Sequence, residues 1–126
     1  MIHFDTNFLI LSLIPGTPQH GHRQAWLAAG EPLNISTVAW GEFLCGPLTA
    51  EQARMADILF PGPEPLFAAD AVRAAELFNQ TGRRRGSLAD CMIAAVAIRA
   101  GAALATENLS DFRPFVPFGL QMFIPP

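Results

Sequence analysis

The chain has 126 residues, a mass of 13.6 kDa, a formal net charge of −3 and a pI of about 5.5. This length is typical of one domain with one core, so we expect a single domain over residues 1–126. The acidic balance argues against broad nucleic-acid binding through the overall field. A local basic patch remains open, because all eight basic residues are Arg, which binds phosphate in a bidentate manner.

The chain is unusually poor in charge. Charged residues make up 15% of it, against about 25% in typical domains, and hydrophobic residues make up 51%. Such a surface favours a partner, so we expect a dimer or a complex. The apolar run at 8–14 is shorter than the ~20 residues of a membrane span and has no basic segment before it. We therefore expect no membrane segment and a cytoplasmic location.

The predicted elements alternate between strand and helix. Expected strands cover residues 1–4, 33–35, 102–105 and 120–124, with a possible minimal strand at 66–67. Expected helices are a short one through Ile14 that is capped by Thr6 or Asn7, then 18–29, 37–45, 49–59, 70–81 and 87–100, with a loop or single turn at 106–112. This alternation predicts an α/β fold with three layers, α/β/α, around a mostly parallel sheet.

Three acids occupy unusual positions. Asp5 ends the first strand, and Glu42 and Asp90 lie on helices without a Lys or Arg three or four residues away. Such carboxylates must be solvated in a cleft, protonated, or bound to a cation. In a parallel sheet they can meet at the carboxyl edge of the strands, where ligands bind, and clustered acids select Mg²⁺ or Mn²⁺.

Each acid also has a purely structural interpretation. Asp90 is three residues after Ser87, the spacing of a capping box at a helix N-terminus. Thr6 and Asn7 beside Asp5 can simply cap a helix, and Glu42 can point to solvent. The common location of the acids favours a functional interpretation.

Four segments together resemble a PIN domain, and more narrowly a VapC-type toxin ribonuclease of a toxin–antitoxin pair. They occur in the family's order and span nearly the whole chain: Phe4–Asn7, Ser36–Phe43, Leu88–Ala95 and Ala105–Phe112. The resemblance implies a Mg²⁺- or Mn²⁺-dependent endoribonuclease whose partners are an RNA substrate, a cognate antitoxin and a second copy of itself.

The resemblance also assigns site residues. Asp5, Glu42 and Asp90 would form the acidic core, and the segment after the third strand would complete it. Glu107 stands there where a basic residue is common. Asn108 stands where some relatives have an acid, which leaves the fourth ligand open between Asn108 and Asp111.

Other polar residues would support this site. Thr6, Asn7 and Thr106 would orient ligands or a water molecule. The run Arg83-Arg84-Arg85 lies shortly before Asp90 and either contacts RNA phosphates or forms a solvated turn.

The remaining candidates have simpler explanations. His20 and His22 do not face one another on a helix and are expected at a solvated surface. Cys45 and Cys91 are expected to be buried free thiols.

Acids at the ends of strands also occur in three alternatives to the ribonuclease. A phosphoacceptor receiver domain normally has a late Lys, and the chain contains none. A phosphatase of the aspartate-nucleophile type needs Asp-x-Asp, whereas Asp5 is followed by Thr6-Asn7. The third is a PIN-like protein that binds RNA or a partner without cutting.

Overall fold

A four-stranded parallel sheet forms the centre of the computed structural model, which describes residues 1–125. The strand order is β2-β1-β3-β4, and each neighbouring pair is parallel. The strands are β1 (Ile2–Phe4), β2 (Leu33–Ile35), β3 (Ala103–Ala105) and β4 (Gln121–Met122). This arrangement confirms the predicted α/β class, although β4 is shorter than expected.

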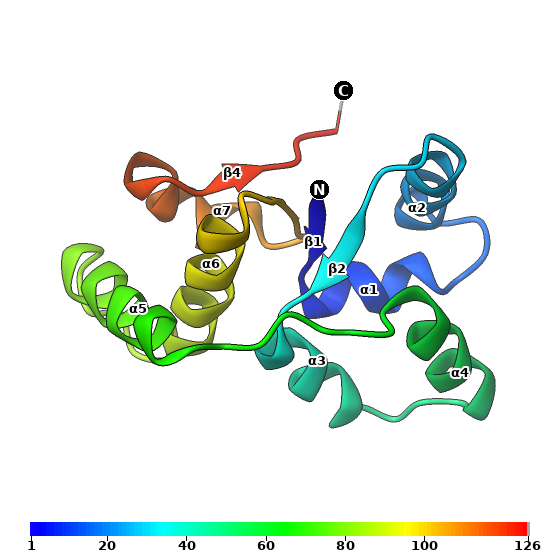
Figure 1. Ribbon diagram of the computed structural model, residues 1–126, viewed down its shortest axis with the longest axis horizontal. Coiled ribbons are helices and arrows are strands. Elements are labelled where there is room, and N and C mark those ends of the chain that lie inside the picture. The colour runs from blue at the N-terminus through cyan, green and yellow to red at the C-terminus, as the bar shows by residue number, and fades with distance from the viewer. Residues whose placement is uncertain (126) are drawn as a thin grey trace.

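Helices cover both sides of the sheet and make the three layers. Figure 1 shows α5 and α6 on one side of β1 and β2, and α1, α2 and α4 on the other. The helices are α1 (Thr6–Ser12), α2 (Pro18–Ala28), α3 (Thr37–Leu44), α4 (Ala50–Leu59), α5 (Ala68–Gln80), α6 (Leu88–Ala100) and α7 (Leu109–Phe112), followed by the 3-10 helix η1 (Arg113–Phe118). Within residues 1–125 no helix is long and apolar enough to cross a membrane.

Several helix ends follow from local sequence. Thr49 and Gln52 form the predicted capping box of α4, and α6 ends at Gly101, whose φ of 66° suits glycine. The first helix differs from expectation, because Asp5 itself caps α1 by accepting a hydrogen bond from the Thr6 amide (2.8 Å). Neither Thr6 nor Asn7 is the cap.

The prediction of a short strand at 66–67 is wrong. The bridge in this region joins Ser36 to Glu64 instead, and Phe67 is the N-cap residue of α5. The Asp70 carboxylate accepts a hydrogen bond from the Phe67 amide, which lets α5 begin at Ala68, two residues earlier than predicted. A carboxylate in the first turn of a helix is favourable because it pairs with free amide groups.

Aromatic rings fill the core on the α1 and α2 side. Phe4 makes edge-to-face contacts with Phe8, Trp26 and Phe60 at ring centroid distances of 5.2 to 5.8 Å. Trp26 therefore packs against the core. On the other side, small buried residues such as Ala94 and Ala97 of α6 let α5 pack closely.

The predicted burial of both thiols holds for only one of them. Cys91 is fully buried, but Cys45 is exposed at the C-cap of α3, and both are free. Cys45 follows the last residue of α3, and its apolar neighbour Leu44 is itself 54% exposed, so the neighbouring sequence does not cover the thiol.

Candidate metal-binding site at the carboxyl edge of the sheet

The register of the central strands brings distant polar residues to one edge. Phe4 pairs with Ala105, so Asp5 and Thr106, the residues that follow, leave the sheet side by side. The Asp5 amide donates to the carbonyl of Ala105 (2.9 Å), and the Thr106 hydroxyl donates to Asp5 Oδ2 (2.9 Å). The edge is therefore held together by contacts between segments 101 residues apart.

Asp5 is the most buried acid of this edge. Its residue is 4% exposed, and each carboxylate oxygen accepts one hydrogen bond, from the Thr6 amide and from the Thr106 hydroxyl. Burial raises the pKa of the Asp5 carboxyl, and the negative charges of Glu42 and Asp111 raise it further, while the two hydrogen bonds oppose the shift. Asp5 thus carries a carboxylate whose negative charge is only partly compensated.

Glu42 reaches the same edge from α3. The Thr6 hydroxyl lies 2.9 Å from Glu42 Oε1 and 3.3 Å from the carbonyl oxygen of Ala39. These hydrogen bonds join the start of α1 to α3. Glu42 is exposed, in keeping with a residue that faces a cleft or solvent. Thr6 therefore orients Glu42, as Thr106 orients Asp5.

Asp90 enters from the first turn of α6, but not as a capping residue. The Ser87 hydroxyl donates to the Arg84 carbonyl (2.7 Å), and Ser87 makes no side-chain cap, so the predicted alternative of a capping box is wrong. Burial, together with the negative charges of Asp5, Asp111 and Glu42, raises the pKa of the Asp90 carboxyl to about 6, and the positive charge of Arg84 opposes the rise. Four carboxylates thus act on one another across this edge.

Asp111 and Asn108 both lie near this edge, on and before α7. Asp111 raises the pKa of both Asp5 and Asp90, and its Oδ1 pairs with Arg84 Nη1 at 3.2 Å. Asn108 is the N-cap residue of α7, and its backbone amide donates to the Thr106 hydroxyl (2.9 Å). Asp111 is therefore the fourth acidic group at this edge, and Asn108 is a neutral polar residue beside it.

The donor set suits a hard divalent cation. It consists of carboxylate oxygens, which Mg²⁺ and Mn²⁺ prefer. Within residues 1–125, no hydrogen bond contributes to the pKa shift of the Asp90 carboxyl. As the side chains stand, no three His, Cys, Asp or Glu residues in the described part of the chain close around an ion position. Three of the four acids instead hold polar partners: Asp5 with Thr6 and Thr106, Glu42 with Thr6, and Asp111 with Arg84.

The other predicted residues are placed less centrally. Asn7 is exposed on the first turn of α1, and Arg83 and Arg85 are exposed on the turn between α5 and α6. One further contact was not predicted from the sequence: the Gln19 side-chain amide donates to Glu107 Oε1 at 2.6 Å, beside Thr106. Nothing local in the sequence indicates this pairing, because 88 residues separate the two side chains.

Comparisons with known proteins agree with this architecture. The family model of the PIN domain matches residues 2–113. A solved toxin–antitoxin complex from Klebsiella pneumoniae contains a chain that is 30% identical, with a TM-score of 0.68 and coverage of 89% of this chain and 90% of that one.

Two further solved structures share the fold at lower identity. One is FitAcB from Neisseria gonorrhoeae, with 22% identity, a TM-score of 0.73 and coverage of 98% and 97% of the two chains. The other is VapBC2 from Rickettsia felis bound to a promoter DNA fragment, with 22% identity, a TM-score of 0.72 and 98% coverage of both chains. No curated protein matches the chain.

Proposed function

The chain belongs to the PIN domain family, and from this premise we propose that it is a Mg²⁺- or Mn²⁺-dependent endoribonuclease that acts as the toxin of a toxin–antitoxin pair. The observation that carries the proposal is the meeting of Asp5, Glu42, Asp90 and Asp111 at the carboxyl edge of one parallel sheet. These acids come from four different segments of the chain. In open α/β sheets this edge is where ligands bind.

The acids serve as ligands in this proposal. Asp5 and Asp90 are the principal ones, because burial and neighbouring charges raise their pKa values and a cation would relieve both effects. Glu42 and Asp111 complete the set, with Asn108 as a neutral oxygen donor beside them. A divalent cation supplies Lewis acidity there, which favours ionisation of an attacking water and stabilises charge on the phosphoryl oxygens.

The supporting residues hold this arrangement. Thr106 and Thr6 fix the carboxylates of Asp5 and Glu42 through hydrogen bonds of 2.9 Å each. Asn7, exposed beside them, is a further polar group within the first turn of α1. These residues position ligands and need not transfer protons.

RNA is the proposed substrate, and the Arg83–Arg85 run is the proposed source of phosphate contacts. Arg84 already reaches the acidic edge through its ion pair with Asp111. Guanidinium groups that neutralise phosphates make binding depend on salt concentration. RNA affinity of this protein should therefore fall as salt rises.

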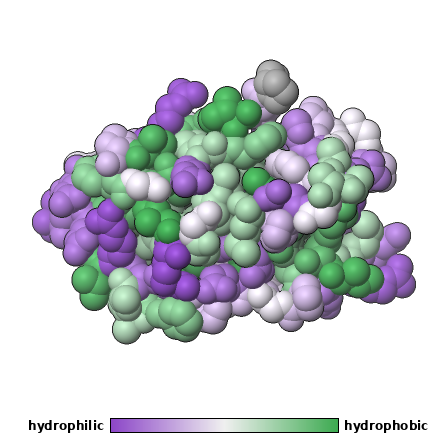
Figure 2. Space-filling view, turned by 45° about the horizontal axis from the view of Figure 1, so that its top comes forward, coloured by the Kyte–Doolittle hydropathy of each residue, from purple (hydrophilic) through white to green (hydrophobic). Residues whose placement is uncertain are grey.

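The proposed protein partners are a cognate antitoxin and a second copy of the chain. The 30% identical chain from Klebsiella pneumoniae belongs to a toxin–antitoxin complex, which supports the first. Apolar side chains lie on the surface, as the separate green patches of Figure 2 show, and residues such as Ile58 and Val72 are 73% and 62% exposed. We place the toxin in the cytoplasm, where RNA is available.

The test is cleavage of mixed cellular RNA by the purified protein in Mn²⁺, in Mg²⁺ and in chelator, with Asp90→Asn beside the wild type. Discrete fragments that require both the metal and Asp90 are expected, because the substitution removes a ligand charge with little change in volume. Exposed Asp57 of α4 provides the control, since Asp57→Asn should cut like the wild type.

A non-catalytic PIN-like protein is the second candidate. The observation in its favour is that the acids do not close around an ion position as they stand. Intact RNA under every condition, from antitoxin-free protein that measurably binds Mn²⁺, would replace the ribonuclease with this candidate.

A further inference from the structure

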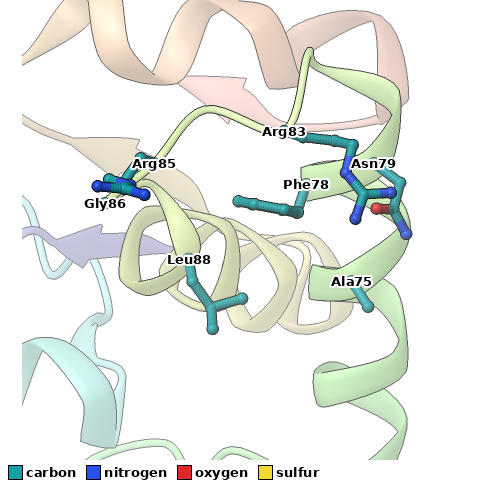
Figure 3. Close-up of a pocket in the computed structure, with 7 residues that line it drawn as sticks. All are labelled: Ala75, Phe78, Asn79, Arg83, Arg85, Gly86 and Leu88. Carbon is teal, nitrogen blue, oxygen red and sulfur yellow. The ribbon is translucent and has the colours of Figure 1, made fainter.

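A pocket of about 580 Å³ opens between α5 and the start of α6. Figure 3 shows Phe78 pointing from α5 toward α6, with Arg85 on one side and Arg83 beside Asn79 on the other. Leu88 and Ala75 form the rest of the apolar lining. The volume falls within the range of about 300–1,000 Å³ that is usual for sites that bind small organic groups.

The lining combines two kinds of chemistry. Arg83 and Arg85 are exposed, and in residues 1–125 the ion pairs of Arg side chains involve Arg73, Arg84 and Arg99 instead. Their guanidinium groups are therefore available for an anion. Phe78 is half-buried and points into the pocket, and Leu88 is 45% exposed. An aromatic surface between cationic side chains suits a nucleotide, whose base stacks while its phosphates pair with Arg.

The pocket and the acidic edge lie on different faces of the first turn of α6. Leu88 lines the pocket and Asp90 belongs to the acidic group, and side chains two positions apart on a helix do not face each other. Arg84, between the two pocket arginines, turns the other way and pairs with Asp111. An RNA strand that presents a phosphate to the acids and continues across this turn would reach the pocket.

We propose that this pocket is a subsite for a nucleotide that flanks the cleaved bond, and that it contributes to the choice of cut sequence. Phe78 stacks on the base, Asn79 hydrogen-bonds its edge, and Arg83 and Arg85 hold the adjacent phosphates. This inference rests on the proposed ribonuclease function. It adds the residues that would decide where the RNA is cut.

The experiment compares variants on a randomised single-stranded RNA and sequences the cut ends. For Phe78→Leu, the base preference should flatten at one position beside the cut and persist at the others, with the rate on the preferred RNA reduced about tenfold, in line with the loss of one stacked base. Arg85→Gln should slow cleavage and weaken its salt dependence. Arg54→Gln, an exposed arginine on α4, removes the same charge elsewhere and should change neither.

A binding measurement in the Asp90→Asn background separates substrate contact from chemistry. A short fluorescein-labelled RNA of mixed sequence should bind more weakly when Phe78→Leu or Arg85→Gln is added. Asn79→Ala, an exposed position, tests the base edge if circular dichroism shows that Phe78→Leu has not folded.

The outcomes distinguish the two proposals. If the wild type cuts RNA but all three pocket variants retain its full sequence preference and affinity, the subsite is refuted and the ribonuclease stands. If the wild type neither cuts nor binds RNA, the proposed function fails and the subsite with it.

Discussion

Asp5 combines a structural and a proposed chemical role in one side chain. It caps α1 through the Thr6 amide, and it accepts the Thr106 hydroxyl that ties β3 to β1. Replacing it therefore disturbs local structure as well as any ligand set, whereas Asp90 makes no cap. For this reason Asp90→Asn is the sharper test of chemistry, and loss of folding in Asp5→Asn would not argue against a metal site.

His3 is the second informative residue at this scale. It is 1% exposed in β1, and neither ring nitrogen has a hydrogen-bond partner among the described residues. Burial lowers the pKa of its imidazole to about 4; Arg99 and the N-terminal ammonium add to this effect and Glu64 opposes it. The ring is therefore held neutral at the pH where an exposed histidine begins to take up a proton.

We expect His3→Leu to remove part of the acid sensitivity of folding. As pH falls from about 6.5 to about 4, the unfolded chain binds a proton at His3 that the folded chain does not, so the free energy of unfolding decreases by up to about 3 kcal/mol. In the variant, the free energy of unfolding should not show this decrease. At pH 7.5 the variant should be at least as stable as the wild type, because two buried polar atoms without hydrogen-bond partners are gone. Urea unfolding at pH 7.5 and 5 measures both.

His20 of α2 provides the control for this measurement. His20→Gln leaves His3 in place, so its stability should decline between the two pH values as in the wild type. An equal decline in His3→Leu would show that the imidazole does not stay neutral in the folded protein.

At the scale of elements, Arg99 joins three segments on the side of the sheet opposite α1. Its Nε lies 2.9 Å from Asp70 Oδ1 in α5, its Nη1 lies 2.7 Å from Glu64 Oε1, and its Nη2 donates to the Pro65 carbonyl (2.8 Å). The guanidinium also lies over the Phe67 ring, 4.4 Å from its centroid. Arg99 thus connects the C-terminal turn of α6 with the start of α5.

Removing this guanidinium should destabilise the fold. Arg99→Met keeps much of the apolar stem but leaves the Asp70 carboxylate, whose side chain is 3% exposed, without a cation. We expect a loss of about 2–3 kcal/mol, at the low end for a broken buried pair because Arg99 itself is 31% exposed. Urea unfolding monitored by circular dichroism gives the value.

A double-mutant cycle tests the cause. In the Asp70→Asn background no buried charge is left unpaired, so the additional cost of Arg99→Met should be clearly smaller. Equal costs in both backgrounds would assign the effect to Glu64 and Phe67 rather than to Asp70.

At the scale of the whole molecule, a chain with few charges places four acids at one edge. Without a cation these acids repel one another, and burial adds to the cost of their ionised forms. A cation that binds the folded chain and not the unfolded one raises stability by mass action. The metal should therefore act on stability as well as on RNA cleavage.

We expect Mn²⁺ to raise the Tm of the wild type, with about 2.7 kcal/mol of added stability at a free concentration one hundred times the Kd. Without metal, Asp90→Asn should be about 1 kcal/mol more stable than the wild type, because one charge is removed from the repelling group. In Mn²⁺ this order should reverse. Differential scanning calorimetry with Mn²⁺ and with chelator measures each case.

The exposed acid Asp57 of α4 is the matched control, since Asp57→Asn should gain the same stability from Mn²⁺ as the wild type. An Asp90→Asn protein that gains just as much would exclude Asp90 as a ligand.

Sequence alone determined the alternation of strands and helices, the parallel sheet class and the capping box at Thr49, because these depend on periodicity and on residues a few positions apart. It also placed Asp5 at the end of a strand and Asp90 in the first turn of a helix. Local pattern failed where a distant segment decides which residues pair. The strand predicted at 66–67 is absent, because Ser36 forms its bridge with Glu64 instead.

Only the tertiary structure decided which side chains meet. The contacts of Thr106 with Asp5 and of Thr6 with Glu42 span 101 and 36 residues. The pairing of Arg84 with Asp111 and the pocket beside Phe78 likewise depend on how α6 packs against its neighbours. A run of residues fixes the chemistry that is available, but the packing of the helices on the sheet sets the distances between groups, and those distances determine charge coupling and binding.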